Sequence, residues 1–309
     1  MIGFLRHAGA RLGSALITLW LAVTVAFFLA RLSGDPVRRI LGDFATPEQL
    51  DDLREQLGLS DPLFVQYFRY LGDLVTLNFG NSLVYNVPNI DLIMARLPYS
   101  VSLGALAILI AVSVGIPLGM LAAVYEGKWI DRVASTVALI GQSAPLFWIG
   151  MMAILLFAQI LNWLPAGQAN SPASYILPAT TLALLPLAQI ARLTRSSMSE
   201  VLSSPFVDAL RARGLSSGRV QFLHALRNAS LPVITIIGLQ AGLLLSAAVT
   251  IEAVFSWPGL GTLAVNAASA RDFSLVQAIV VLGALAFIII NLVIDLLYTV
   301  LDPRTRTAG

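Results

Sequence analysis

Apolar runs long enough to cross a lipid bilayer constrain this chain more than any other feature. Hydrophobic residues make up 57% of the sequence and charged residues only 12%, and the apolar residues are gathered in long blocks. A hydrocarbon core about 30 Å thick needs roughly 20 apolar residues per helix. Lipid offers the backbone no hydrogen-bond partner, so each span is expected to be helical. The sequence therefore predicts an all-α integral membrane protein with six spans, near residues 11–32, 98–124, 133–161, 176–193, 231–255 and 276–301.

The distribution of arginine predicts the orientation of these spans. Lysine and arginine in short loops accumulate on the cytoplasmic side of a membrane. Both chain ends and the 192–231 stretch are rich in arginine, whereas the loop at 162–175 has no basic residue. We therefore expect both termini to be cytoplasmic and residues 33–97 to be external. The basic residues on the predicted inner face are Arg6, Arg11, Lys128, Arg132, Arg192, Arg195, Arg211, Arg213, Arg219, Arg227, Arg304 and Arg306.

The external segment carries the signals of two short helices. Thr46, Pro47 and Gln49 form a capping-box pattern at the start of the first, and Gly58 is placed to end it. Asp61 and Pro62 can start the second, which presents an apolar and aromatic face. Such a segment is either a small cap packed on the helix bundle or a platform for an external partner, and spacing alone leaves both open. The face comprises Phe64, Tyr67, Phe68 and Leu71.

The stretch at 192–231 predicts a short helix outside the membrane on the cytoplasmic side. Ser204 can cap it, Pro205 suits its first position, and Gly214 can end it in left-handed geometry. A helix of two turns is marginal alone in water, so its apolar side must pack on something. A second helical run begins at Ser216 and leads into the next span. The apolar side of the short helix is Phe206, Val207 and Leu210.

At these residues the chain resembles the inner-membrane permeases of ATP-binding-cassette importers, whose cytoplasmic loop carries an E-A-A-x-x-x-G signature followed by Leu-Pro. The segment 208–214 fits that frame, with Asp208 in place of Glu and Leu210 in place of Ala. Within this superfamily it is similar to the dipeptide, oligopeptide and nickel permease group, specifically the first of two paired permeases. The similarity covers nearly the whole chain and is carried by residues 57–67, 96–98, 211–215, 224–229, 231–232, 254–261, 295–298 and 301–304.

The resemblance implies the fold of a type I importer permease and a division of labour among subunits. Two six-helix permeases would form the path, two ATP-binding subunits would drive it, and an external binding protein would deliver peptide. The helix near 205–214 would couple ATP hydrolysis to movement of the spans. The coupling residues implied are Phe206, Val207, Asp208, Ala209, Leu210, Arg211 and Gly214.

The chain carries no signature of an enzyme or of a bound cofactor. It lacks a G-x-x-x-x-G-K-[ST] phosphate loop, so ATP and Mg are expected on the partner ATPases. Cysteine is absent, which excludes disulfides and thiolate metal sites. His7 and His224 fall in predicted cytoplasmic regions, which argues against an intramembrane protease. A net charge of +2 does not suggest a nucleic-acid partner.

Polar residues within or near the predicted spans are the candidates for a translocation path. Each either lines water or hydrogen-bonds one helix to another, and for a single residue the second explanation is the more common. Glu252, near the external end of the fifth span, is a candidate for meeting a peptide amino group. Asp295, near the cytoplasmic end of the last span, is expected to pair with an arginine. The path candidates are Gln142, Ser143, Gln189, Gln240 and Glu252.

Two other functional classes fit parts of the sequence. An ion-coupled secondary transporter uses broken helices, and residues 115–117 or 141–145 can break one. A non-transporting scaffold would have partners but no substrate. Within the importer class, nickel chelate or haem is an alternative cargo to peptide. We expect the chain to divide into a first helix with its external segment (1–97), a five-helix core with the coupling loop 192–231 (98–301), and a cytoplasmic tail (302–309).

Overall fold

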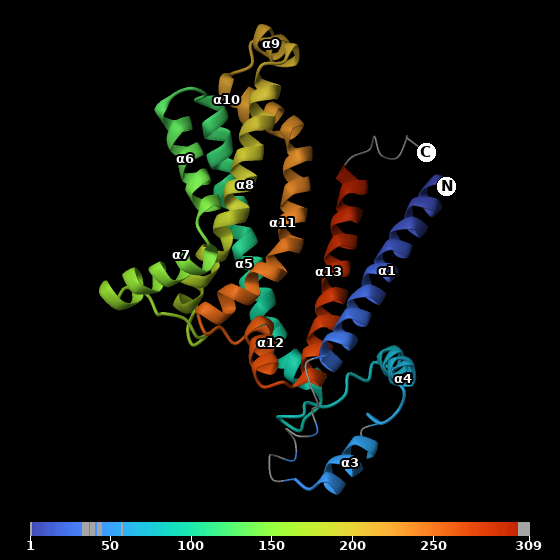
Figure 1. The fold of residues 1–309 in the computed structure, drawn as a ribbon. Helices are drawn as coiled ribbons and strands as arrows, with labels where there is room; N and C mark the ends of the chain where they lie inside the picture. The colour runs from blue at the N-terminus through green and yellow to red at the C-terminus, as the bar shows by residue number, and fades with distance from the viewer. Residues whose placement is uncertain (1, 33–36, 38–40, 42–44, 57, 302–309) are drawn as a thin grey trace. The chain divides into compact units, whose positions relative to one another are not determined.

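The computed structural model describes residues 2–301, apart from 33–36, 38–40, 42–44 and 57. The predicted tail at 302–309 lies outside the described residues. Every regular element in the described part is a helix, apart from an isolated bridge between Asn81 and Pro88 (Figure 1). The chain forms two compact units, one of Met1–Pro98 with Gly259–Ile288 and one of Tyr99–Pro258 with Ile289–Gly309.

The first unit combines the N-terminal part of the chain with a segment near its C-terminus. Its helices are α1 (Ile2–Leu32), α3 (Pro47–Gln56), α4 (Leu63–Val75), α12 (Leu260–Ser269) and the first part of α13 (Phe273–Leu301). An apolar cluster joins the start of α5 (Asn89–Val124) to α12 and α13. Its buried members are Ile93, Leu263, Ala267, Leu275 and Ala278.

Buried polar groups fasten the 80–88 loop of the first unit to the turn before α13. The carboxylate of Asp272 is fully buried and accepts hydrogen bonds from the Ser82 hydroxyl and from the backbone N–H of Leu83. Asn89 donates to the Phe79 carbonyl at 2.7 Å and to the Ser274 hydroxyl at 2.8 Å. These bonds satisfy groups whose burial unpaired would cost free energy, so they fix the loop in one conformation.

The two helices predicted in the external segment are both present. The Thr46 N–H donates to Gln49 Oε1 at 3.0 Å and the Gln49 N–H to Thr46 Oγ1 at 3.4 Å, which confirms the capping box at the start of α3. Gly58 has φ of +65°, the left-handed conformation expected after the helix end. Pro62 directly precedes α4, as predicted.

The second unit is a layered bundle in which α8 (Ile176–Leu202) is central. It packs on α6 (Trp129–Ser143), α7 (Leu146–Ala153) and, most extensively, α11 (Leu226–Val254) (Figure 1). Gly115 and Gly119 of α5 lie against the Leu187 and Ala191 carbonyls of α8, where a Cβ would clash. This small-residue stripe lets α5 and α8 approach closely. A 3₁₀ turn (Pro172–Tyr175) leads into α8.

Trp257, at the end of the second unit's core, is fully buried. Its indole N–H donates to the Tyr99 carbonyl at 3.1 Å, and its ring packs edge-to-face on Tyr175 with centroids 4.5 Å apart. The sequence of 256–261 allows either a re-entrant piece or a surface turn. In either arrangement, the Trp257 side chain anchors the loop in the interior beside the start of α8, which explains the use of a bulky aromatic there.

The span predicted over residues 133–161 is not one continuous helix, and its break lies within 141–145, one of the two places where the sequence predicts that a helix can break. In this segment α6 ends at Ser143, α7 begins at Leu146, and a π-helix (Ile154–Ile160) follows α7. Pro145 is the cause, because it lacks an N–H and disfavours helical geometry at the preceding residue. The second half of this segment points away from α6 in Figure 1. Residues 115–117, the other predicted break, lie inside the uninterrupted α5.

The remaining apolar runs form long helices. By length and apolar composition, four helices in the described residues can cross a membrane: Asn89–Val124, Pro172–Leu202, Ser217–Val254 and Phe273–Leu292. Two shorter apolar helices are Gly13–Leu29 and Leu146–Ile160. Ser217–Val254 runs from α10 (Ser217–Arg219) through a π-helical stretch (Val220–Ala225) into α11, without a break at Pro232.

Candidate coupling and translocation sites

The short helix predicted at 205–214 is present as α9 (Pro205–Ala212), with Pro205 in its first turn. It ends in a Schellman motif: the Gly214 N–H donates to the Arg211 carbonyl at 2.9 Å and the Leu215 N–H to the Leu210 carbonyl at 3.3 Å. Gly214 has φ of +80°, which confirms the left-handed position expected from the sequence. This turn directs the chain from α9 back toward α10.

The predicted capping role of Ser204 is only half right. Ser204 occupies the N-cap position, but its side chain makes no capping bond to α9. Its hydroxyl instead donates to the Val201 carbonyl at 2.6 Å, because α9 follows so closely after the end of α8 at Leu202 that an orphan carbonyl of α8 is within reach. Ser204 therefore ties the beginning of α9 to the end of α8.

α9 has one face docked in its own chain and one face open. Val207 is fully buried, Leu210 is partly buried, and α9 packs against α8 and the 220–225 stretch. Phe206 is 45% exposed, so only part of the predicted apolar side is covered within this chain. The Asp208 carboxylate lies 3.6 Å from the Arg211 guanidinium, and both are exposed, as is Ala209.

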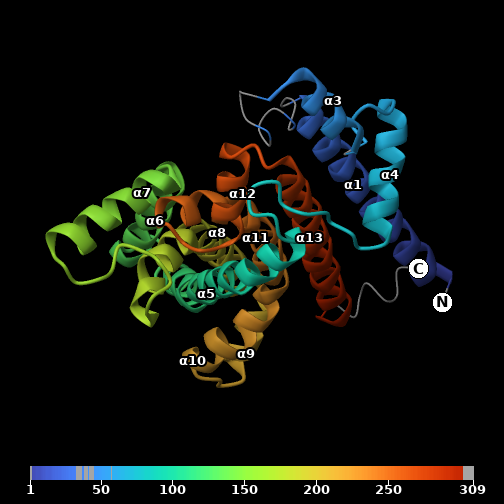
Figure 2. The same cartoon turned by 90° about the horizontal axis from the view of Figure 1, so that it is seen from below.

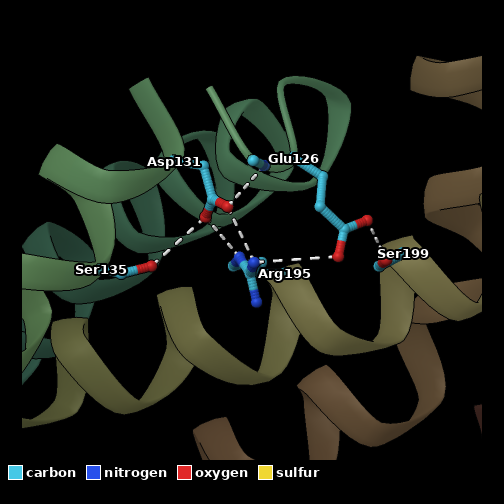
Figure 3. A network of polar contacts seen from close by, with 6 residues as sticks. Glu126, Asp131, Ser135, Arg195 and Ser199 are labelled. Atoms are coloured by element: carbon cyan, nitrogen blue, oxygen red, sulfur yellow. Dashed lines mark hydrogen bonds and ion pairs between the residues drawn. The ribbon is translucent and has the colours of Figure 1, made fainter. Parts of the chain in front are cut away.

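A polar network joins α8 to the turn between α5 and α6 (Figure 3). Arg195 of α8 donates to both carboxylate oxygens of Asp131, Nε to Oδ1 at 2.5 Å and Nη2 to Oδ2 at 2.8 Å. The Gly127 N–H and the Ser135 hydroxyl donate to the same carboxylate at 3.0 and 3.3 Å. Planar bidentate pairing of this kind is the strongest form of ion pair that arginine makes. We call the Asp131–Arg195 pair the clasp.

Asp131 is buried by the network, and its charge is stabilised there. Hydrogen bonding from Arg195, aided by the Gly127 N–H, lowers the pKa of Asp131 to about 2. Glu126 extends the network on its exposed side: it lies 3.8 Å from the Arg195 guanidinium and accepts from the Ser199 hydroxyl at 2.6 Å. Both Arg195 and Ser199 lie in about the last two turns of α8, so the network fixes the end of α8 that precedes α9.

Some of the path candidates are buried between helices, and others lie at the break between α6 and α7. Gln240 of α11 is buried and donates to Gln189 of α8 at 2.6 Å, a bond that joins two helices. Glu252 is also buried and accepts from the Ser100 hydroxyl of α5 at 2.5 Å. Gln142 is partly buried and Ser143 exposed at the α6–α7 break. The side chain of Asp295 lies outside the described residues.

Comparison with known proteins decides what kind of molecule carries these sites. A family model for the binding-protein-dependent transport system inner membrane component matches residues 115–307, and a model for the N-terminal part of such components matches 1–104. The chain belongs to this family. It is a multi-pass permease of the inner membrane, of the class found in ATP-binding-cassette importers.

Curated relatives match the permease over nearly its full length. The glutathione transport system permease protein GsiC of Escherichia coli (strain K12) is 41% identical over 285 residues, covering 92% of this chain and 93% of the relative. The dipeptide transport system permease protein DppB of Alkalihalophilus pseudofirmus is 36% identical over 321 residues, with 94% and 96% coverage. These values confirm the resemblance to the peptide permease group.

Solved structures establish the fold of the permease. An inward-facing methionine transporter, MetNI, matches with a TM-score of 0.58 and 16% identity, covering 69% of this chain and 97% of that chain. An amino acid transporter solved with histidines matches with a TM-score of 0.54 and 17% identity, covering 68% and 94%. In the described residues of the permease, no group of three or more His, Asp or Glu side chains is placed to hold a metal ion.

Sequence reasoning missed the clasp. The sequence places Arg195 among the basic residues of the inner face and indicates no role for Asp131. The partners are 64 residues apart in sequence, so no local spacing rule could connect them. Arg195 lies just beyond the predicted span at 176–193, so its place in the sequence gives no signal of a buried partner.

Proposed function

We propose that the permease imports peptides, pairing with a second permease to form the path. The observation that carries this proposal is the full-length similarity to a glutathione permease at 41% identity and to a dipeptide permease at 36%. Both relatives are named for short peptides with a free amino group and carboxylate. Nickel chelate and haem are the alternative cargoes. Competition for uptake separates them from peptide, because a dipeptide should compete only with a peptide cargo.

The topology proposed has six spans with both termini in the cytoplasm. The four long apolar helices supply four spans, α1 the first, and the α6–α7 segment the third in sequence. The arginines of the 192–231 stretch support a cytoplasmic position for α9. The proposed domain organisation keeps residues 1–97, the core at 98–301 and the tail at 302–309 as its three parts.

The partners proposed are a second permease, two ATP-binding subunits that bind ATP and Mg, an external binding protein and the surrounding lipid. The family description names a binding-protein-dependent system, and the methionine and amino acid neighbours are ABC transporters. In this division of labour the chain is a transporter subunit and not an enzyme.

α9 is the proposed contact with an ATP-binding subunit. Phe206 leaves 45% of its surface uncovered beside the exposed charges of Asp208 and Arg211, a combination that suits a protein interface with an apolar centre and a charged rim. Val207 holds the helix to its own chain. To transmit a movement, α9 must be packed on its own chain by one face and contact the ATP-binding subunit by the other.

The clasp is proposed to stiffen the attachment of α9 to its own chain. It joins the first turn of α6 to α8, the Gly127 N–H bond adds the α5–α6 turn, and Ser204 joins α8 to α9. Displacement of α9 by an ATPase would therefore move α5, α6 and α8 together. The path would open and close as this group moves, with Gln142, Ser143, Gln189, Gln240 and Glu252 as the candidates for contact with the peptide.

Coupling is tested by Asp208→Lys in the full transporter reconstituted in liposomes. We expect ATP hydrolysis to continue while peptide uptake falls at least tenfold, because the reversed charge spoils the α9 contact. Asp52→Lys, a charge reversal on exposed α3, is the matched control and should leave uptake unchanged. Unchanged uptake in Asp208→Lys contradicts the proposal.

The competing class, an ion-coupled carrier, is tested with the same vesicles. The importer requires ATP-binding subunits for any uptake, whereas an ion-coupled carrier works alone under an ion gradient. Uptake by the permease alone, driven by a proton or sodium gradient, contradicts the assignment.

A further inference from the structure

α4 crosses the C-terminal end of α1 within the first unit. It is seen end-on in Figure 1, where α1 is seen along its length, and lengthwise from below in Figure 2. The contact is specific: the Tyr67 hydroxyl lies 2.7 Å from the Thr24 hydroxyl, and the Phe27 ring packs on Tyr67 and Tyr70 at 5.3 and 5.7 Å. Because the two helices cross at a large angle, α4 lies along the surface of the bilayer if α1 spans it.

The two sides of α4 differ sharply in polarity. Phe64, Phe68 and Val75 follow one another at helical spacing, and their exposed fractions are 66%, 67% and 84%. The opposite side carries Gln66, Arg69 and Asp73, which line a cavity of about 270 Å³.

The polar side of α4 is engaged in hydrogen bonds. Gln66 donates to the carbonyls of Leu59 and Asp61, and Arg69 pairs with the Asp61 carboxylate at 2.7 Å. The apolar side is thus the one that this chain leaves open.

The open side of α4 continues an apolar surface of α1. Phe28 of α1 is 46% exposed and stacks on Tyr67 of α4, with ring centroids 6.4 Å apart. Trp20, Val25 and Leu29 extend the exposed apolar side of α1 along its length, each more than half uncovered. A transmembrane helix presents such a surface to lipid, so the same lipid reaches the aromatic side of α4.

We infer that α4 is an interfacial helix, with Phe64 and Phe68 inserted in the outer leaflet of the bilayer. The inference rests on the proposed external placement of residues 33–97. An amphipathic helix with Phe on its apolar face lies in the plane of the membrane interface, with that face buried at the boundary between headgroups and acyl chains and its polar side toward water. The polar side of α4, on which Gln66 is buried and Arg69 is exposed, then lies away from the lipid. α4 in this position holds the outer end of α1 at a fixed depth.

The natural absence of cysteine allows a direct test. Single-cysteine variants Phe64→Cys, Phe68→Cys and Asp73→Cys are labelled with bimane, in the full transporter with cysteine-free partner subunits, in phosphatidylcholine vesicles. We expect lipid carrying a nitroxide at acyl carbon 5 to quench the probes at 64 and 68 at least twofold more than the probe at 73. Aqueous iodide should give the reverse order.

Two results would overturn the inference. Lipid quenching at 64 and 68 that is no stronger than at 73 means that the aromatic side is not selectively inserted. Protection of positions 64 and 68 from both quenchers means that another protein covers them. Labelling of Asp52→Cys on α3 with a membrane-impermeant thiol reagent checks the side of the membrane separately. Labelling from the cytoplasmic side overturns the external placement and this inference together, whereas external labelling with the wrong quenching pattern overturns this inference alone.

Discussion

Arg195 and Asp131 form a two-pronged ion pair across 64 residues of sequence, with donor–acceptor distances of 2.5 and 2.8 Å. The carboxylate is buried and the guanidinium is one-third exposed. The pair joins α6 to α8 about two turns before the end of α8 at Leu202. It therefore connects the proposed ATPase contact with the helices that would line the path.

Removing the arginine should destabilise the permease. Arg195→Ala leaves the Asp131 carboxylate buried without its main partner, at a cost of about 2 kcal/mol in the free energy of unfolding. The loss is measurable as a lower unfolding temperature of the purified transporter. Arg192→Ala, which removes an exposed arginine one turn earlier, is the control and should leave that temperature unchanged. Equal effects of the two changes would mean that the clasp does not stabilise the fold.

Acid should weaken the clasp in a defined pH range. The pKa of Asp131 is lowered to about 2, whereas an unfolded aspartate titrates near 3.9, so the stabilisation is complete above about pH 5 and declines as pH falls toward 2. The difference in unfolding temperature between the wild type and Asp131→Asn should be constant from pH 7 to 5 and shrink by pH 3. A difference that stays constant to pH 3 would show that the Asp131 pKa is not depressed in the folded protein.

The two faces of α9 should respond differently to truncation. Val207→Ala removes buried methyl groups and should cost about 2 kcal/mol in the stability of the permease itself. Phe206→Ala should leave that stability nearly unchanged, since Phe206 is half exposed, but weaken binding of the ATP-binding subunits. Thermal unfolding and co-purification yield separate the two effects. The account fails here if both variants lower stability equally and neither affects co-purification.

Gln240 should contribute to helix packing. Gln240→Leu removes the 2.6 Å bond to Gln189 between α11 and α8, and we expect a loss of about 1 kcal/mol in stability. A role limited to packing leaves the KM for peptide unchanged. A change in KM without a change in unfolding temperature would instead place Gln240 in contact with the cargo.

Local features of the fold were predictable because they depend on neighbouring residues. The capping box at Thr46, the start of α4 after Pro62 and the left-handed Gly214 each follow from the chemistry of a few consecutive positions. Apolar runs likewise located the long helices, since lipid requires both length and apolar composition.

Features that depend on distant residues could not be predicted. The 141–145 pattern indicated a possible helix break, and the break lies there, but no local pattern gives the direction that the next helix takes after Pro145. The Gln189–Gln240 bond and the clasp could be predicted only by knowing which helices meet. Polar residues in apolar spans mark such contacts without identifying the partner.

Site-specific photocrosslinking from α9 tests the central claim most directly. A benzoylphenylalanine at position 206, in the complete transporter, should crosslink to an ATP-binding subunit, with a yield that changes when ATP is bound. The same probe at position 64 should give no crosslink to that subunit. Crosslinks from position 206 confined to the permease itself, or reaching an external protein, would contradict the account.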